Sequence, residues 1–231
     1  MTPEQALPPA QLIRSAAALQ RLLTWLSPAF PVGAFAWSAG LETAIVERTV
    51  TNADSLQDWL AGALAHGGIR QDAIFLAQAW RAGTATALAE LAELYLALVP
   101  SAERHAETIA MGDAFLIAAR AWPSEVFARL PDPCPYPVAV GAVAATHDIP
   151  LPDTLIGLLT AVVHGQVSVA VRLVPLGQTA GLKVMAALEP EIAGLATTAE
   201  ATTLEDIGGI AYAADIAQMR HETLQPRIFR S

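Results

Sequence analysis

Apolar residues recur at steps of three and four along most of this chain, and this spacing constrains the fold more than any other feature. Leu12 to Leu26, Leu56 to Leu64 and Leu88 to Leu98 all show it. Such steps place side chains on one face of an α-helix, whereas a strand needs alternation. Val167 to Val174 is the best strand candidate because of its β-branched residues, but it directly follows a helical run, which favours a continuing helix. We therefore expect an all-α fold.

Helix boundaries are marked by capping residues. Asp54 is expected to cap a helix that begins near Ser55, with Gln57 as its capping-box partner. Ser101 and Ser124 are expected to cap later helices. Residues that break helices separate the remaining segments, and these are Pro28, Pro31, Gly67, Gly68, Gly83, Pro150 and Pro152.

Four prolines at positions 131, 133, 135 and 137 form the densest break in the chain. The segments on both sides are apolar and helical, so we favour a single domain over 1–231, with a bundle-like arrangement of helices and a proline-rich central loop. A chain of this length can bury roughly 70–75% of its unfolded surface. We expect a mobile N-terminus over 1–19 and an extended C-terminal tail over 220–231.

Composition excludes several classes of protein. The net charge is −9, with one lysine among thirteen basic residues, so the dense basic surface of a nucleic-acid-binding protein is missing. The lone Cys134 cannot form an internal disulfide, which suits a reducing cytoplasm, and an inert thiol is expected. The N-terminal segment has no basic region typical of a signal peptide. These features predict a cytoplasmic protein.

The most apolar stretch runs from Leu155 to Val174. It contains His164, Gln166 and Arg172, which are costly inside a bilayer. A buried core helix is therefore favoured over a membrane span, and no association with a membrane is expected.

Groups that could carry chemistry are sparse. The five histidines form no pair at helical metal-ligand spacing, so neither a metal site nor a bound cofactor is expected. His147 beside Asp148 is interpreted as a solvated loop pair. Ser38 stands in a sequence similar to a hydrolase nucleophile elbow but lacks the strand that such an elbow needs. No glycine-rich phosphate loop is present. We expect no catalytic residues.

Three segments are not explained by a plain helical core. Ser27 to Glu42 (SPAFPVGAFAWSAGLE) is an aromatic turn that suits either a core plug or a contact surface. Val171 to Gly181 (VRLVPLGQTAG) leaves one helix and restarts near Gln178, as a helix–loop–helix connection would. Met219 to Ser231 (MRHETLQPRIFRS) suits either a frayed tail or a peptide that docks onto an acidic partner through its arginines.

These segments resemble the signatures of the UreF family of urease accessory proteins. Ser27 to Glu42 is similar to SPALPVGAFSYSQGLE, Val171 to Gly181 to VRLVPLGQTDGQ, and Arg220 to Ser231 to RHETQYSRLFRS. Weaker matches are Glu107 to Gly112 (ETIAMG) and Tyr136 to Gly141 (YPVAVG). The likeness runs from about residue 20 to the end, in the same order as in the family.

The resemblance implies an all-helical homodimer that is not an enzyme. It implies a complex with the accessory protein UreD, also called UreH, and with the GTPase UreG. That complex delivers nickel to apo-urease, and GTP hydrolysis gates the release. The protein itself is then an adaptor that binds UreD/UreH and recruits or regulates UreG.

The resemblance also implies partner-binding positions. Phe35 of the aromatic turn and Arg227 of the tail are expected to lie near each other and to support recruitment of the GTPase, with Glu42 as a further candidate. The full set is Phe35, Trp37, Glu42, Gln178, Arg220, His221, Glu222, Arg227, Phe229 and Arg230. Trp37 replaces the usual tyrosine, and Ala39 and Ala180 replace polar residues, so hydrogen bonds that the family makes there are absent.

Two alternatives remain open at this stage. One is a metallochaperone that binds nickel directly, suggested by the five histidines in a nickel pathway. The other is an enzyme that uses Ser38 or His147.

Overall fold

The computed structural model describes residues 9–231, and every regular element in that range is helical, which confirms the all-α prediction. Three short 3₁₀ helices lie at η1 (Ala34–Ala36), η2 (Glu125–Ala128) and η3 (Leu204–Asp206). The α-helices are α1 (Pro9–Trp25), α2 (Leu41–Val46), α3 (Ala53–His66), α4 (Gly68–Arg81), α5 (Ala85–Leu98), α6 (Ala102–Ala119), α7 (Tyr136–Thr146), α8 (Leu151–Leu173), α9 (Gln178–Ala187), α10 (Glu189–Ala201) and α11 (Tyr212–His221).

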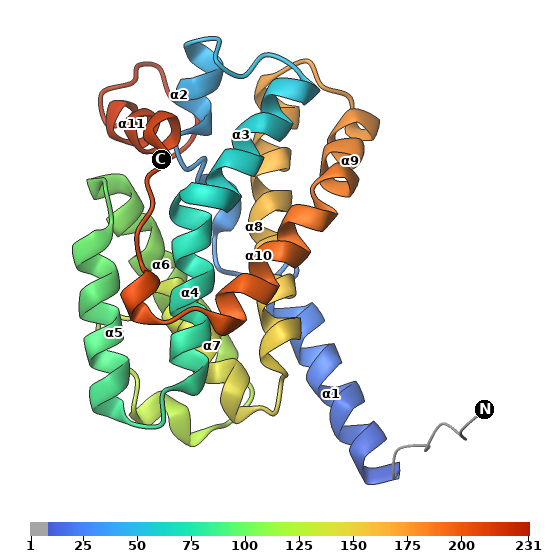
Figure 1. Cartoon of the computed structure of the whole chain (residues 1–231), viewed down its shortest axis with the longest axis vertical. Coiled ribbons are helices and arrows are strands. Elements are labelled where there is room, and N and C mark those ends of the chain that lie inside the picture. The colour runs from blue at the N-terminus through green and yellow to red at the C-terminus, as the bar shows by residue number, and fades with distance from the viewer. Residues whose placement is uncertain (1–8) are drawn as a thin grey trace.

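Helix α1 projects from the body of the molecule (Figure 1). Its last turns carry the buried Leu22 and Trp25, whereas Leu19 and Leu23 are exposed. Of the N-terminus that was expected to be mobile, residues 1–8 lie outside the described residues and 9–19 belong to α1.

Helices α4 and α7 form the centre of the body, and α7 is apolar on all sides and buried from Tyr136 to Ala144. Two glycines permit the close approach of backbones here. A Cβ atom at Gly141 would collide with the carbonyl oxygen of Leu76 on α4, and one at Gly112 on α6 would collide with the carbonyl oxygen of Cys134. These glycines end the two weaker sequence motifs, which therefore have a packing role.

The predicted caps are confirmed at two of three positions. The Ser101 hydroxyl accepts a hydrogen bond from the Arg104 amide at 3.2 Å, and Ser124 opens η2. The prediction for Asp54 was wrong, because Asn52, an equally good capping residue, lies two positions earlier. Its side chain accepts from the Ser55 amide at 2.9 Å, so α3 begins at Ala53.

Helix α8 continues to Leu173, which confirms the preference for a helix over a strand. By length and composition it could cross a membrane, and 44% of its most apolar window is buried inside the protein. Its buried face packs against α4 and α10, as expected of a core helix. Helix α9 begins at Gln178, the restart that the sequence predicted.

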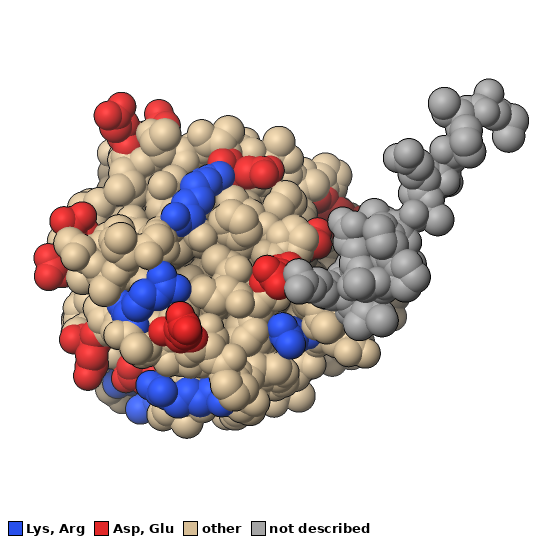
Figure 2. Space-filling model, turned by 90° about the horizontal axis from the view of Figure 1, so that it is seen from below, with Lys and Arg blue, Asp and Glu red and all other residues tan. Residues whose placement is uncertain are grey.

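Charged side chains are sparse on the face seen in Figure 2, and uncharged residues form most of that surface. This agrees with a charged fraction of only 15%. The C-terminus lies near α2 and α11, at the opposite end of the molecule from the tip of α1 (Figure 1). The segments singled out in the sequence meet at that end.

Candidate functional site

The aromatic turn, Ser27 to Glu42, has both buried and exposed aromatic side chains. Phe30 and Trp37 are buried and belong to the core, whereas the Phe35 side chain is 73% exposed. Gly33 and Gly40 adopt left-handed backbone conformations with φ of 74° and 80°, which glycine tolerates best. The turn therefore packs into the core through Phe30 and Trp37, and Phe35 between them is exposed.

Gly40 also allows α11 to lie directly on the start of α2. A Cβ atom at this position would come within 2.7 Å of the Gln218 backbone nitrogen, which a side-chain adjustment cannot relieve. The close approach matters because α11 carries His221 toward the interior.

The C-terminal tail lies along the aromatic turn. The Arg230 amide donates to the Ala36 carbonyl at 2.8 Å, and the Ser38 amide donates to the Ser231 carbonyl at 2.8 Å. The Ser38 hydroxyl donates to that same carbonyl. Phe229 is buried in the core cluster. The tail thus has fixed hydrogen bonds and a buried anchor, which differs from the mobile peptide that the sequence suggested.

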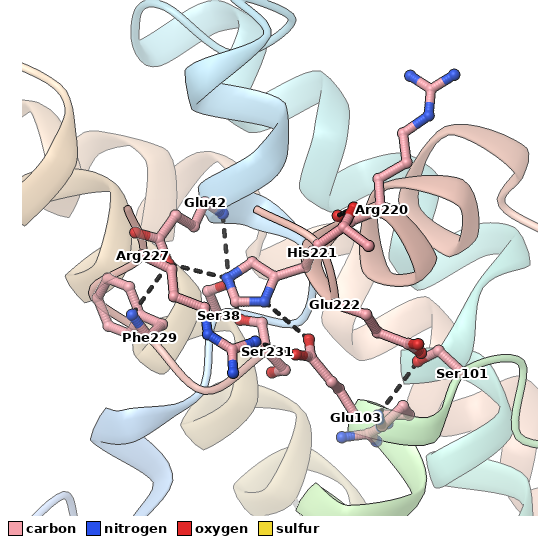
Figure 3. Close-up of polar contacts among 12 residues, drawn as sticks. Ser38, Glu42, Ser101, Glu103, Arg220, His221, Glu222, Arg227, Phe229 and Ser231 are labelled. Carbon is pink, nitrogen blue, oxygen red and sulfur yellow. Dashed lines mark hydrogen bonds and ion pairs between the residues drawn. The ribbon is translucent and has the colours of Figure 1, made fainter. Parts of the chain in front are cut away.

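Glu42 on α2 holds the tail from the inside (Figure 3). Its carboxylate accepts hydrogen bonds from the backbone amides of Ile228 at 2.7 Å and Phe229 at 2.9 Å. It lies 2.9 Å from Nε2 of His221 as well. Hydrogen bonds to a buried carboxylate are stronger than neutral ones, so this one side chain fixes both the tail and α11.

His221 links Glu42 to a second carboxylate. Its Nδ1 lies 2.7 Å from Oε2 of Glu103 on α6, and Oε1 of Glu103 is 2.5 Å from Nη1 of Arg227. Each nitrogen of this ring therefore faces a carboxylate oxygen. Figure 3 shows the side chains of Glu42, His221, Glu103 and Arg227. The first two are buried, and the Arg227 side chain is 39% exposed. We call these four residues the anchor network.

A second polar group lies beneath the tail. Arg104 contacts Asp72 at 2.5 Å and Glu107 at 3.1 Å, and the Tyr95 hydroxyl donates to Asp72 at 2.6 Å. Burial raises the pKa of the Glu107 carboxyl, and Arg104 opposes that shift. Ser231 reaches Glu107 through a 3.5 Å contact between its hydroxyl and the carboxylate. The end of the tail is thus tied to α6 as well as to the turn.

Sequence reasoning missed the residues on α6 and α4 that complete these networks. Glu103, Arg104 and Glu107 follow one another at helical spacing and read as an ordinary solvated face. The one available signal was Glu107, which begins the weak ETIAMG motif.

The predicted partner-binding residues divide into a buried and an exposed set. Trp37, Glu42, His221 and Phe229 are buried. Their side chains hold the tail in place, and any influence of Glu42 on a partner is therefore indirect.

The exposed set is Phe35, Gln178, Arg220, Glu222, Arg227 and Arg230. Arg230 stacks over the Trp37 ring at 5.1 Å, and Arg220 pairs with Glu47 at 3.1 Å. Glu222 accepts from the Ala102 amide at the start of α6. Within residues 9–231, the Gln178 side chain makes no hydrogen bond to the tail.

Arg172 of α8 was not among the predicted residues, yet it joins the turn to the tail. Its guanidinium donates to the Phe35 carbonyl at 3.3 Å and stacks over the Phe229 ring at 4.7 Å. This arginine belongs to the VRLVPLGQTAG segment, so all three singled-out segments meet here.

Ser38, Cys134 and the potential metal ligands are not arranged as an active site would require. Ser38 is fully buried and bonded to the tail. Burial raises the pKa of the Cys134 thiol to about 12, which leaves it protonated and inert. Among the described residues, no three histidine, cysteine, aspartate or glutamate side chains are placed to hold a metal ion.

The interpretation of His147 as a solvated loop residue was wrong. Its ring is buried against the Trp25 indole, with centroids 5.2 Å apart, and its Nδ1 lies 3.3 Å from Nη1 of Arg21 on α1. Burial and the nearby Arg21 lower the pKa of this imidazole. His147 therefore packs the base of α1 onto the body.

The fold and site define an all-helical protein in which a buried polar network holds a turn and a tail at the surface. A model of the UreF family matches residues 50–189. The chain is 52% identical to the urease accessory protein UreF of Rhodopseudomonas palustris (strain BisB5), over 93% of this chain and 92% of the relative.

Two further relatives carry the same name. The chain is 49% identical to the protein of Rhizobium etli (strain ATCC 51251) over 94% of this chain and 98% of the relative, and 50% identical to that of Agrobacterium fabrum over 93% and 97%. The chain belongs to the UreF family of urease accessory proteins, which act in urease maturation.

Proposed function

We propose that this protein is an adaptor in the nickel-dependent maturation of urease. In this proposal it binds UreD/UreH, recruits or regulates the GTPase UreG, and acts as a homodimer on apo-urease in the cytoplasm. It supplies binding surfaces, while the nickel and GTP chemistry belongs to its partners. The five exposed residues Phe35, Arg172, Arg227, Ile228 and Arg230, which we call the tail surface, carry this proposal.

Hydrogen bonds on the buried side of the tail hold the tail surface in one conformation. Glu42 holds the backbone at residues 228 and 229, while the Ile228 side chain remains 77% exposed. Exposed apolar side chains held in one conformation lose little entropy on binding, which favours recognition of a partner. Phe35 contributes an aromatic group of the kind enriched at binding hot spots.

The charge of the tail surface differs from that of the rest of the chain. The protein carries a net charge of −9, yet this surface has three arginines. Of these, Arg227 has a carboxylate partner within 4.0 Å, and Arg172 and Arg230 have none among the described residues. Arginines beside apolar groups suit a partner with acidic residues around an apolar one.

Capture of purified partners tests the proposal. UreD and UreG are incubated with the tagged wild-type chain and with Phe35→Ala and Arg227→Ala variants, and the captured proteins are quantified. Loss of a hot-spot side chain costs about 2 kcal/mol or more in binding free energy. We therefore expect each variant to capture less UreG, with a dissociation constant raised about thirtyfold or more. Deletion of the whole tail is a poorer test, because it would remove the backbone amides that bond to Glu42 and the Ser231 hydroxyl that contacts Glu107.

Two matched substitutions serve as controls. Ile117→Ala removes a side chain that is 74% exposed on α6, and Arg120→Ala removes an arginine that stacks over Phe127 as Arg230 stacks over Trp37. Both should bind partners as the wild type does. Unchanged capture by Phe35→Ala and Arg227→Ala would show that the tail surface is not the recruiting surface. A stoichiometric nickel site in equilibrium dialysis of the isolated chain would instead favour the metallochaperone.

A further inference from the structure

A pocket of about 140 Å³ opens between the aromatic turn and α8. Aromatic side chains of α1 and the turn form one wall, and small residues of α8 form the other. The lining residues that matter here are Trp25, Phe30, Phe35, Trp37, Ala161 and Gly165. An engineered cavity of about 150 Å³ with apolar walls accommodates benzene, so this pocket has room for one aromatic ring.

Polar residues of α8 also line the pocket, namely His164, Gln166, Ser168 and Arg172. Arg172 lines it and is exposed, with one contact to the Phe35 carbonyl and one to the Ser168 carbonyl. Its Nη1 has no hydrogen-bond partner among the described residues, and no carboxylate lies within 4.0 Å. The guanidinium is therefore available to an anion next to a ring that fills the pocket.

Gln166 supplies a second polar group from the α8 wall. Only 8% of this residue is exposed, and its amide has no hydrogen-bond partner in the part of the chain that the structure describes. An amide can both donate and accept hydrogen bonds, so Gln166 can bond a polar group that enters the pocket.

We infer that this pocket receives an aromatic side chain from a partner-protein segment that carries a carboxylate beside the ring. The inference rests on the proposed adaptor function and names the chemistry of the segment that it binds. The apolar walls take the ring, Arg172 pairs with the carboxylate, and Gln166 bonds a polar atom of the segment. Charge complementarity favours an acidic segment, because the pocket rim is cationic on a chain with a net charge of −9.

The first test uses a small probe on the isolated chain. 4-Fluorophenylacetate carries a ring and a carboxylate, and its binding is measured by ¹⁹F NMR, with the neutral 2-(4-fluorophenyl)ethanol for comparison. For a ligand of this size we expect a dissociation constant in roughly the millimolar range. Arg172→Gln should weaken binding of the acid by about fivefold or more, to the level of the alcohol.

Gly165→Leu is the decisive variant because it fills the pocket without a clash at Cβ, where no atom lies within 4 Å. We expect it to weaken binding of both probes at least tenfold. Gly194→Leu on α10 is the matched control, since its Cβ also meets no atom within 4 Å and it lies outside the pocket. It should bind both probes normally. Binding to Gly165→Leu at wild-type strength would overturn the inference.

The second test separates the pocket from the adaptor function. Gly165→Leu should also weaken capture of UreD or UreG, whereas Gly194→Leu should not. If probe binding is lost while capture persists, the pocket does not hold a partner segment and the inference fails. The adaptor function then still stands if Phe35→Ala and Arg227→Ala impair capture, and it falls separately if they do not. If Gly165→Leu changes self-association of the chain but not capture of UreD or UreG, the pocket binds a second copy of this chain. That result would also overturn the inference.

Discussion

Glu42 and His221 lie 179 positions apart in the sequence and 2.9 Å apart in the structure, with both side chains buried. Neither residue faces a partner. Their contact links α2 to α11, and Glu42 also bonds to the backbone of the tail. These contacts hold the exposed arginines and apolar side chains of the tail surface in position. The exposed tail surface is therefore supported by buried polar side chains.

Glu42→Gln should release the tail. The amide replaces a carboxylate that accepts from two backbone amides and faces His221. Leaving a buried donor without its acceptor costs about 1–3 kcal/mol, so we expect a lower unfolding midpoint in urea and faster tryptic cleavage after Arg227, detected by mass spectrometry. Glu47→Gln is the control, because its pair with Arg220 is exposed and contributes about 1 kcal/mol or less. Equal effects of the two substitutions would contradict this role of Glu42.

Gly40→Ala and Gly33→Ala together separate backbone strain from crowding. Both glycines have a left-handed backbone, so each alanine costs about 1–2 kcal/mol. Only Gly40 has the Gln218 backbone within 2.7 Å of the new Cβ, so Gly40→Ala should be the more destabilising by at least ~1 kcal/mol. Urea unfolding monitored by circular dichroism measures the difference. If the two variants lose equal stability, α11 does not depend on close approach at Gly40.

Acidification should loosen the base of α1 through His147. The pKa of this imidazole is lowered in the folded state, so the unfolded chain takes up the proton first. The stability that the neutral ring contributes is complete above the ordinary histidine pKa of ~6.5 and is lost as the pH falls toward the folded value. The slope reaches at most about 1.4 kcal/mol per pH unit.

His147→Gln tests this because it removes the titration while it keeps a polar side chain. The difference in unfolding free energy between wild type and His147→Gln should change as the pH falls below about 6.5. His105→Gln, at an exposed position on α6, is the control and should follow the wild type. A His147→Gln profile parallel to that of the wild type would rule out this contribution.

Cys134 should be unreactive in the native protein. Burial raises the pKa of its thiol to about 12, and only the thiolate reacts. At about pH 8, labelling by a disulfide reagent should be roughly a thousandfold slower than in the chain unfolded in guanidinium. The rate is followed by absorbance of the released thiolate. Comparable rates in the two states would show that the loop from 131 to 137 opens readily.

Local features could be predicted well from the sequence. The continuation of α8, the start of α9 at Gln178 and the caps at Ser101 and Ser124 all follow from periodicity and hydrogen-bonding capacity within a few residues. The prediction that Asp54 caps α3 was wrong for a local reason too. Two good capping residues lie within three positions, and the structure uses Asn52.

Long-range pairings could not be predicted in the same way. Glu103 and Glu107 look like residues of a solvated helix face, and nothing near them in the sequence shows that the tail covers them. The tail itself reads as a mobile peptide, because its anchors Glu42 and Glu103 lie far away in the chain. Arg172 was overlooked because its contacts with Phe35 and Phe229 join three separate segments.

The sequence by itself determined the helical class, most helix boundaries and the family, because apolar spacing, caps and signature segments are properties of neighbouring residues. Only the tertiary structure decided which signature residues are buried supports and which are exposed contacts. That division depends on the close approach of α2, α6, α11 and the tail, where a buried carboxylate is stable only beside the distant donors that satisfy it.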